Sequence, residues 1–352
     1  KCRELTSGEI EAFISQGRAP VVRMRMPDGA TTFNDLIRGE VSFEHKYVPD
    51  FVLMRADGSP LYTLAVAVDD VLMKITHVLR GEDLLSSTPR QIRVYQAMGV
   101  AVEDFPLFAH LPFVMGQDNA KLSKRNGEVS IAWYRESGFL PEAICNYLAL
   151  LGWSPGDDLE NITMKQLTEM FTVEKVHSSP ARFDMKKLEA INGDKIRALT
   201  LDEFLKWSLP FLTKADVITG TDAEIELVKK ALPIIQERII MLNEVPKMLK
   251  FLFTKNFAVE AESVSKITDD ASKEILKRSV KELETVSDWT HTNIEAVLRA
   301  SLIEEMALKP RIAFTALRIA TTGSTISPPL FESMELLGKE ACLLRINAGL
   351  AL

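Results

Sequence analysis

The chain has 352 residues, a length that suggests two or three domains, each able to bury a core of ordinary size. Its formal net charge of −7 argues against a generally basic nucleic-acid-binding protein, so any contact with RNA must come from local basic surfaces. Three widely spaced cysteines exclude a disulfide framework and a paired metal-ligand motif, so we expect a cytoplasmic protein. No apolar run reaches the roughly 18 residues that span a bilayer, so we expect no membrane contact.

The first 49 residues indicate a small mixed segment. We expect a helix after Thr6-Ser7, a strand over residues 21–26 and a turn at Pro27-Asp28-Gly29. By themselves these elements indicate an α+β surface module without an assigned function.

Clearer order begins at residues 51–54, an apolar strand candidate that is followed by an apolar segment over residues 61–68. Residues 75–79 are typical of a buried strand, which ends in the charged residues Arg80, Glu82 and Asp83. Ligands bind beyond the carboxyl ends of strands in parallel α/β sheets, so Arg80 is a candidate site residue. It could equally be a structural partner of Glu82 or Asp83.

Thr88-Pro89 predicts the start of a helix, with the Thr88 side chain as its cap. Ile92, Tyr95 and Met98 form its apolar face, and Gly99 ends it. Residues 105–114 are again apolar and contain His110, which we interpret as a structural histidine.

The five residues Lys121-Leu122-Ser123-Lys124-Arg125 place three cations and a hydroxyl on a short segment. Lysines on such a segment suit phosphate oxygens, because an ammonium on a flexible stem can follow negative charge during a displacement. A solvated surface loop is the alternative interpretation.

Beyond this segment the pattern is mostly helical. Pro141 predicts a helix that ends near Gly152, and Ser178-Ser179-Pro180 and Asn192-Gly193 indicate breaks. Further helices are expected at residues 201–205, 225–242, 245–253, 271–284 and 292–302, and from residue 330. Residues 228–255 carry a local charge of +4, which favours either an RNA-facing surface or an ordinary solvated face.

Several stretches resemble the bacterial glutamyl-tRNA synthetases, in the order of that family. They are Pro60-Leu61-Tyr62 with Asp69-Asp70, residues 75–83, Ser87-Thr88-Pro89, His110-Leu111-Pro112, the Lys-Leu-Ser-Lys-Arg loop, residues 138–143, Phe183-Asp184, Asn192-Gly193 and residues 327–331. The resemblance implies an α/β fold followed by an all-α part. Residues 1–49 would end an acceptor-stem-binding insertion, residues 50–128 would form the second half of a class I Rossmann-like catalytic domain, residues 129–197 a stem-contact helical domain, and residues 198–352 an anticodon-binding domain of two helical bundles.

The resemblance also implies a reaction: a carboxylate of glutamate attacks the α-phosphate of ATP, and the glutamyl group then passes to the 3′ end of tRNA(Glu). Tyr62 and Arg80 would hold glutamate, since a guanidinium offers two parallel donors to a carboxylate. Lys121 and Lys124 would be catalytic, and together with Ser123 and Arg125 they would bind ATP, which brings Mg²⁺ as MgATP. We expect no structural metal in the protein, and a monomer.

Three features depart from the family. Leu61, Thr63 and Val66 stand where the family usually has threonine-tyrosine-histidine and an asparagine before its aspartate pair. No segment resembles the His-Ile-Gly-His-like element of class I synthetases, so we expect that half of the active site lies upstream of Lys1. Leu84 stands where the family often has an aromatic residue, so we assign no adenine contact there.

Alternatives remain open at this point. The chain could be a tRNA-binding fragment without catalysis, or the enzyme could also charge tRNA(Gln). Arg238 is a weak candidate for the residue that reads the anticodon. A relative that glutamylates a modified base is disfavoured by about 150 helical residues after Ala198, and a glutaminyl enzyme by the absence of a β-barrel pattern in the same region.

Overall fold

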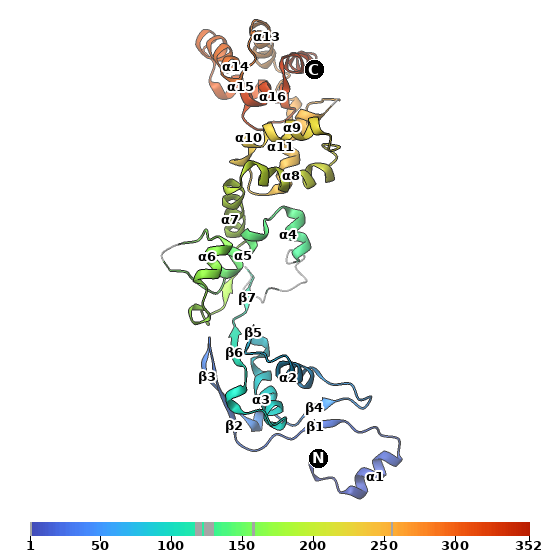
Figure 1. The fold of residues 1–352 in the computed structure, drawn as a ribbon. Coiled ribbons are helices and arrows are strands. Elements are labelled where there is room, and N and C mark those ends of the chain that lie inside the picture. The colour runs from blue at the N-terminus through green and yellow to red at the C-terminus, as the bar shows by residue number, and fades with distance from the viewer. Residues whose placement is uncertain (1, 117–121, 123–129, 157–158, 255) are drawn as a thin grey trace. The chain divides into compact units, whose positions relative to one another are not determined.

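The computed structural model describes residues 2–116, 122, 130–156, 159–254 and 256–352 (Figure 1). The chain divides into two compact units. Unit 1 comprises residues 1–123 and 148–184, and unit 2 comprises residues 124–147 and 185–352. Among the described helices, none combines the length and apolar character that crossing a bilayer requires.

Unit 1 is built on a four-stranded sheet of order β3-β2-β6-β5, with bounds β2 Ala30–Asp35, β3 Gly39–Glu44, β5 His77–Gly81 and β6 Leu107–Leu111. The β2–β3 pair is an antiparallel hairpin, whereas β6 runs parallel to both β2 and β5. In this register Arg80 lies opposite His110, and Asp35 lies opposite Phe108. The register therefore brings three polar side chains from distant parts of the sequence to one region of the sheet.

Helices α2 (Tyr62–Leu72) and α3 (Thr88–Ala97) pack against this sheet and supply its core. Tyr95 from α3 is completely buried together with Ala67 from α2 and Phe108 from β6. The apolar segment expected over residues 61–68 is thus the first part of a helix, and the helix expected at Thr88-Pro89 is confirmed.

The expectation of a buried strand over residues 75–79 is wrong in one respect. Strand β5 begins at His77, and the side chain of Leu79 is 45% exposed while Val78 and Arg80 are partly covered. Successive strand residues point to opposite faces. Because α2 and α3 pack on the face of Val78 and Arg80, the apolar residues of β5 are buried on that face only.

Smaller elements complete unit 1. Strands β1 (Val22–Met24) and β4 (Phe51–Met54) pair antiparallel, and β7 (Val114–Met115) pairs parallel with β8 (Ala181–Arg182). The helix expected after Thr6-Ser7 is α1 (Ser7–Ser15), which the Thr6 side chain caps. The other helix is α6 (Met164–Met170), and the 3-10 turns are Cys2–Glu4, His45–Tyr47, Glu82–Ser87, Val102–Asp104 and Val173–Lys175.

Unit 2 is helical in its described part. Its elements are α4 (Ile131–Ser137), α5 (Pro141–Leu150, whose last turn belongs to unit 1), α7 (Met185–Ala198), α8 (Leu201–Lys214), α9 (Asp222–Ala231), α10 (Pro233–Gln236), the 3-10 turn Leu242–Glu244, α11 (Val245–Phe253), α12 (Ala261–Val264), α13 (Asp270–Glu284), α14 (His291–Leu298), a π-helical segment Arg299–Glu305, α15 (Pro310–Thr322), α16 (Leu330–Leu337) and α17 (Lys339–Leu350).

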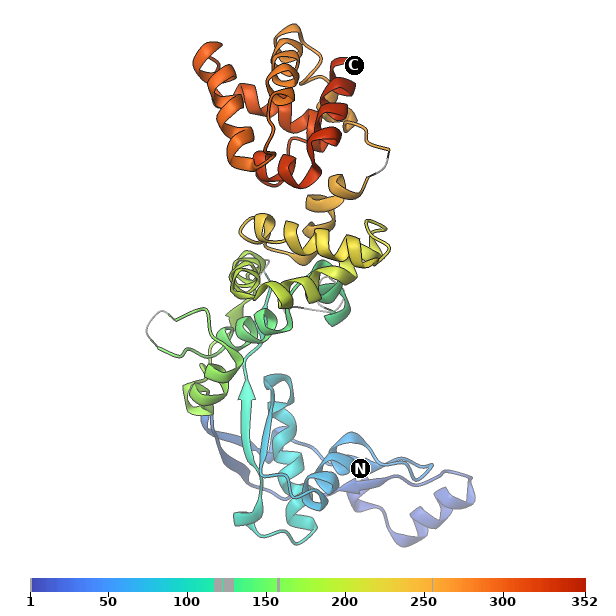
Figure 2. The same ribbon diagram turned by 45° about the horizontal axis from the view of Figure 1, so that its top comes forward.

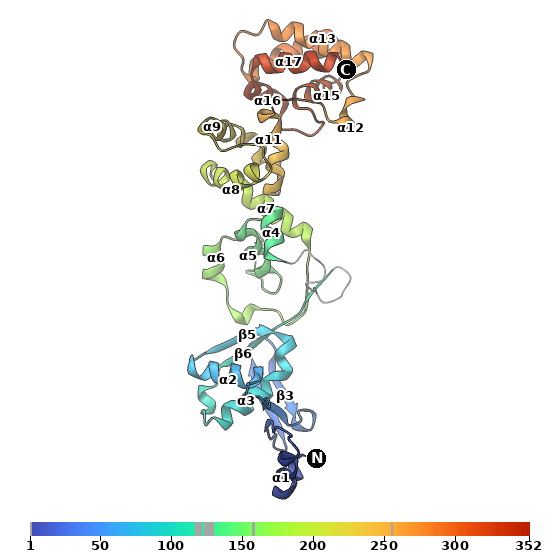
Figure 3. The same ribbon diagram turned by 90° about the vertical axis from the view of Figure 1, so that its right-hand side faces the viewer.

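The helices from α13 to α17, orange to red in Figure 2, surround one apolar core. Helix α17 lies beside α13 in this bundle (Figure 3). Ile275, Leu317 and Ile346 are among its almost completely buried members. The expected order of an α/β part followed by helices is therefore confirmed.

Two local predictions in unit 2 are wrong. The single helix expected over residues 225–242 is interrupted, because Pro233 has no N–H for a bond to the preceding turn and begins the short α10, which ends at Gln236. Asn192-Gly193 lies inside α7 and does not break it. The Asn192 amide is used in packing: its Oδ1 accepts from the Leu140 N–H at 2.8 Å, and its Nδ2 donates to the Ile240 carbonyl at 2.6 Å.

Candidate active site

The side chain of Arg80 in β5 is held by acceptors along one edge of its guanidinium, formed by Nε and Nη2. Its Nε donates to His110 Nε2 at 3.0 Å, and its Nη2 donates to Thr88 Oγ1 at 2.9 Å and to Gln91 Oε1 at 2.8 Å. Nη2 also lies 3.3 Å from the Leu84 carbonyl oxygen. Nη1 makes no hydrogen bond with a described residue. The Nε–Nη2 pair is therefore occupied by the protein, and a carboxylate ligand would meet the Nη1 end of the guanidinium.

The contact of Arg80 with Thr88 explains why the predicted helix cap is absent. Thr88 is the first residue of α3, and the residue before the helix, Ser87, makes no side-chain cap. The Thr88 hydroxyl is directed to Arg80 and lies 3.3 Å from His110 Nε2. Sequence rules assigned this hydroxyl to the helix backbone, whereas tertiary contacts use it to fix a cation.

Glu82, one of the alternative partners of Arg80, is engaged elsewhere. It forms an ion pair with Arg38, and its Oε1 accepts the backbone N–H of Phe113 at 2.9 Å. Glu82 therefore ties the segment after β6 to the 3-10 turn after β5. Arg80 is left in the cluster with His110, Thr88 and Gln91.

Tyr62 opens α2, and its side chain is 54% exposed. The Tyr95 hydroxyl donates to Asp70 Oδ2 at 2.6 Å. Burial is the main cause that raises the pKa of Tyr95, the bond to Asp70 adds to it, and both Arg80 and Tyr62 act on the same hydroxyl electrostatically. Tyr62 and Arg80 thus lie near one common group. Their contact with glutamate stays a prediction.

The Lys-Leu-Ser-Lys-Arg loop is described only at Leu122. The N–H of Leu122 donates to the carbonyl oxygen of Val114 in β7 at 3.0 Å, so this point of the loop is tied to the strand that follows β6. Lys121, Ser123, Lys124 and Arg125 lie outside the described residues, and their roles stay predictions.

Arg238, the candidate for anticodon contact, is exposed and lies just after α10, outside any long helix. Sequence analysis missed its neighbour Arg318 on α15, whose pKa is lowered by burial first and then by the Arg238 guanidinium. Arg318 Nη1 donates to the Pro328 carbonyl oxygen at 2.6 Å. The sequence pointed to Arg318 only through its position shortly before residues 327–331, one of the stretches that resemble the synthetase family.

The basic surplus over residues 228–255 is smaller in the structure than in the sequence. Lys229 pairs with Asp202 from α8 at 2.8 Å, and that carboxylate lies outside the counted range. Lys230, Lys247 and Lys250 are exposed, while Lys255 lies outside the described residues. An RNA-facing role for this surface stays a prediction.

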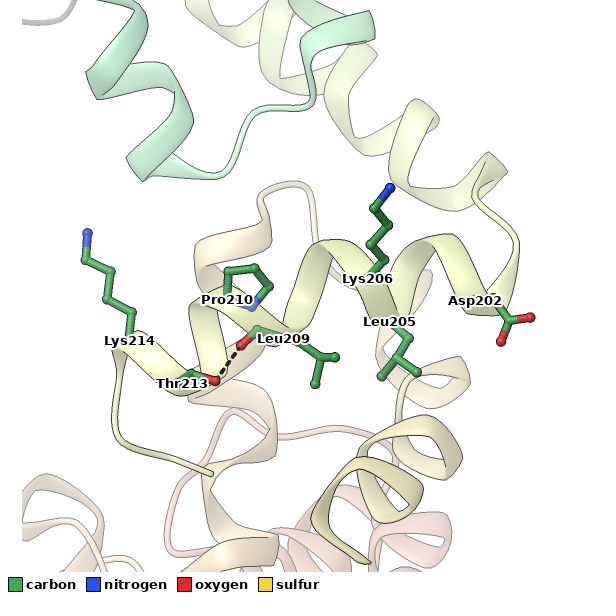
Figure 4. Close-up of a pocket in the computed structure, with 7 residues that line it drawn as sticks. All are labelled: Asp202, Leu205, Lys206, Leu209, Pro210, Thr213 and Lys214. Carbon is green, nitrogen blue, oxygen red and sulfur yellow. Dashed lines mark hydrogen bonds between the residues drawn. The ribbon is translucent and has the colours of Figure 1, made fainter. Parts of the chain in front are cut away.

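Residues of α8 line two hollows in unit 2. One of about 780 Å³ lies on α8 itself, where Lys206 and Lys214 project to the opposite side from Leu205 and Leu209 (Figure 4). The other, of about 770 Å³, lies between α4, α5 and α8 and includes Trp207. Neither includes a residue that the sequence assigns to a substrate. Within the described part of the chain, no group of three or more His, Cys, Asp or Glu side chains is placed to hold a metal ion.

Comparison with known proteins identifies the family of the chain. Residues 1–190 match the family model of class I tRNA synthetases (E and Q), catalytic domain, and residues 195–350 match that of an anticodon binding domain. The chain is similar to a solved glutamate tRNA ligase from Elizabethkingia meningosepticum CCUG26117 in complex with its amino acid. The TM-score is 0.83 at 28% identity, and the match covers 99% of this chain and 72% of that chain.

Curated relatives give the same result at higher identity. The glutamate-tRNA ligase of Arthrobacter sp. (strain FB24) is 48% identical over 357 residues, which cover 98% of this chain and 70% of that protein. The glutamate-tRNA ligase of Nocardioides sp. (strain ATCC BAA-499 / JS614) is 48% identical over 356 residues, which cover 99% and 72%. The chain therefore belongs to the glutamate-tRNA ligase family of class I aminoacyl-tRNA synthetases.

Proposed function

We propose that the protein to which this chain belongs acts as a glutamate-tRNA ligase on glutamate, ATP and tRNA(Glu). A carboxylate oxygen of glutamate attacks the α-phosphorus of ATP, and pyrophosphate leaves. The terminal ribose hydroxyl of the tRNA then attacks the carbonyl carbon of the glutamyl-adenylate, and AMP leaves. Membership of the family supports the reaction, and the fixed guanidinium of Arg80 is the structural observation that carries the choice of an acidic substrate.

Arg80 and Tyr62 are proposed to hold glutamate. A buried ion pair needs a guanidinium whose remaining hydrogens already have partners, because an incompletely bonded buried cation is costly. The contacts of Arg80 with His110, Thr88 and Gln91 meet this requirement and leave Nη1 for the substrate. Tyr62, exposed at the start of α2, can add one directed hydrogen bond from its phenol.

Lys121 and Lys124 are proposed to stabilise the negative charge that builds on the phosphates during adenylate formation, with Ser123 and Arg125 as further contacts of ATP. Mg²⁺ is proposed to enter as MgATP, because it prefers phosphate and water oxygens as ligands. Phosphoryl and nucleotidyl transfers depend mainly on alignment and on charges placed in advance. We also propose that the protein works as a cytoplasmic monomer.

The activation step can be tested by ATP–pyrophosphate exchange in the presence of glutamate and tRNA(Glu). We expect Lys124→Ala to lower the exchange rate by about 10²–10³, the usual effect of removing one such charge. Lys165→Ala, at an exposed position of α6, is the matched control and should exchange normally. Unchanged exchange in Lys124→Ala would remove the loop from the mechanism, and binding of tRNA without any exchange would favour a non-catalytic tRNA-binding chain.

The choice between tRNA(Glu) and tRNA(Gln) is proposed to depend on Arg238, with the Arg318 guanidinium nearby. An arginine that reads a base edge contributes about 1–3 kcal/mol of discrimination. Charging assays with both tRNAs should therefore show that Arg238→Ala narrows the ratio of their rates. A wild-type protein that charges both equally would rule out Arg238 as a discriminator.

A further inference from the structure

Two buried polar residues of neighbouring strands form a chain of contacts that ends at Arg80. They are Asp35 at the end of β2 and His110 in β6, whose side chains are both 0% exposed. His110 Nδ1 lies 2.6 Å from Asp35 Oδ2. Asp35 Oδ1 accepts the backbone N–H groups of Ile37 and Arg38, both at 3.0 Å, and that of His110 at 3.2 Å. The carboxylate is therefore held as an anion by four donors.

These contacts select one tautomer of His110. An ionised carboxylate can only accept, so the proton of the neutral imidazole must be on Nδ1. The guanidinium of Arg80 can only donate, and its Nε lies 3.0 Å from His110 Nε2. His110 Nε2 must then present its lone pair. The chain Asp35–His110–Arg80 is consistent in donors and acceptors only with this tautomer.

We propose that Asp35 and His110 are positioning residues for glutamate binding, which fix the orientation of Arg80 so that its Nη1 end faces the substrate. This inference rests on the proposed role of Arg80 in holding glutamate. Neither residue touches the substrate itself. Their effect is to restrict the side-chain conformation of Arg80 before the substrate binds. The sheet determines this conformation, because its register places Arg80 and His110 side by side on adjacent strands.

Gln91 gives independent support for a cluster arranged around Arg80. Its side chain is almost completely buried, its Oε1 accepts from Arg80, and its Nε2 has no hydrogen-bond partner among the described residues. Buried polar atoms are rarely left unpaired, so each such case requires a reason. Here the amide is oriented to serve the guanidinium, and its own donor stays unpaired.

The positioning role has a consequence for pH. The groups facing His110 are Asp35 from β2, Arg38 after β2, Arg80 from β5 and the uncharged Thr88 from α3. Burial lowers the pKa of His110, the two guanidiniums lower it further, and Asp35 opposes them, with a net lowering. His110 is therefore neutral at neutral pH. When acid does protonate it, Nε2–H is directed at Arg80 Nε–H, and the orientation of Arg80 is lost.

Asparagine and glutamine at position 110 form a matched pair of variants. The asparagine amide reaches the place of the imidazole Nδ1 and can keep the bond to Asp35, but it offers nothing to Arg80. The glutamine amide reaches the place of Nε2 and can offer an acceptor to Arg80. We expect the KM for glutamate of His110→Asn to rise about ten- to hundredfold, the usual effect of losing a hydrogen bond to a charged group, with the KM for ATP unchanged. His110→Gln should recover most of this loss.

The experiment is glutamate-dependent ATP–pyrophosphate exchange with the full-length protein in the presence of tRNA(Glu), as a function of glutamate concentration and pH. In the wild type, the KM for glutamate should rise as the pH falls through the lowered pKa of His110, and His110→Gln should lack this rise. Asp35→Asn provides a second variant if His110→Asn does not fold. Its amide keeps the shape of Asp35 but donates to Nδ1, which moves the imidazole proton to Nε2 against Arg80, so the same rise in KM is expected.

The outcomes separate this inference from the proposed function. If Arg80→Ala leaves the KM for glutamate unchanged, the assignment of Arg80 to the substrate fails. If Arg80→Ala raises that KM but both His110→Asn and Asp35→Asn leave it at the wild-type value, the positioning role alone is overturned. Equal losses in His110→Asn and His110→Gln would also overturn it, because the lone pair offered to Arg80 would then not be the feature that matters.

Discussion

Gly138, between α4 and α5, is the position where one added methyl group should do the most local damage in unit 2. Its φ is +93°, and a Cβ there would lie 2.5 Å from the backbone nitrogen of Leu242 and 2.6 Å from that of Asn243. These atoms cannot move by a side-chain rotation. Gly220 has nearly the same φ, +92°, and no atom lies within 4 Å of the place of its Cβ. The two glycines therefore separate backbone strain from steric overlap.

The magnitudes follow from these contacts. A left-handed conformation costs an alanine about 1 kcal/mol, and this strain is common to Gly138→Ala and Gly220→Ala. In Gly138→Ala the segment at Leu242 must also move away. This breaks the 3.1 Å bond from the Leu242 N–H to the Gly138 carbonyl, about 1 kcal/mol, and loosens the Leu242 side chain, which is 1% exposed. We expect losses of about 3 kcal/mol for Gly138→Ala and about 1 kcal/mol for Gly220→Ala.

Urea denaturation followed by far-UV circular dichroism measures both values, since unit 2 provides most of the helices. The midpoints should be compared together with the slopes, because a changed slope would indicate a change in the denatured state or a lost cooperative transition. If the two variants lose the same free energy of unfolding within about 0.5 kcal/mol, the overlap at Leu242 does not exist in the folded protein, and the reasoning is refuted.

Three further predictions concern buried or capped groups. Arg345, 7% exposed, donates to the carbonyl oxygens of Thr321 and Phe251, both at 2.9 Å. Arg345→Met should therefore lower the free energy of unfolding by about 2–4 kcal/mol in the same denaturation assay. A loss below about 1 kcal/mol would contradict these two hydrogen bonds. Burial raises the pKa of the Cys342 thiol to about 12, whereas Cys145 is exposed. A thiol reagent followed by peptide mapping should therefore label Cys145 in the folded protein and Cys342 only in denaturant. Equal labelling of Cys145 and Cys342 in the folded protein would contradict this prediction. Thr221 is the N-cap of α9, and Glu224 completes the capping box by accepting the N–H groups of Thr221 and its neighbours, which lower the pKa of Glu224 to about 2 from a usual value of 4.5. The stabilisation by Glu224 is thus complete above about pH 4.5 and lost as the pH falls toward 2. Glu224→Gln should therefore show a smaller acid-dependent drop in Tm, and identical drops would exclude the capping box as the cause.

Local rules predicted those elements whose signals are local. Pro89 and Gly99 marked the ends of α3, and residues 245–253 were predicted with the bounds that α11 has in the structure. Pro233, which interrupts the helix expected over residues 225–242, is itself a local signal, whereas the failure at Asn192-Gly193 has a different cause. Asn192-Gly193 resembles a turn, but the Asn192 amide bonds to Leu140 and Ile240, and a Cβ at Gly193 would lie 2.9 Å from Ile240 Cγ2. These residue types were selected by contacts between helices distant in sequence, which a local pattern does not contain.

The candidate site shows the same limit. Arg80 could be found because a charged residue at the end of an apolar strand is a local signal. Asp35 and His110 gave no comparable signal, since a lone histidine and an aspartate before a hairpin are each ordinary. Their meaning depends on the order β2-β6-β5, which brings residues 35, 80 and 110 onto adjacent strands. A lone histidine is more often structural than catalytic, and the local sequence does not predict the register that places His110 beside Arg80.

In the arrangement around Arg80, the free energy needed to order the arginine side chain is spent during folding and not during substrate binding. A free arginine side chain loses rotamer entropy of up to about 2 kcal/mol when a ligand fixes it. At Arg80 the bonds to His110, Thr88 and Gln91 remove most of that freedom before the substrate arrives. In exchange, Gln91 keeps an unpaired buried donor, a group that typically lowers stability by about 1–3 kcal/mol. The two free energies are of similar size, so the gain in affinity for an acidic substrate is about equal to the loss in stability of the fold. A lysine in place of Arg80 could not give the same gain in affinity, because an ammonium lacks the planar fork that the three acceptors hold from one side.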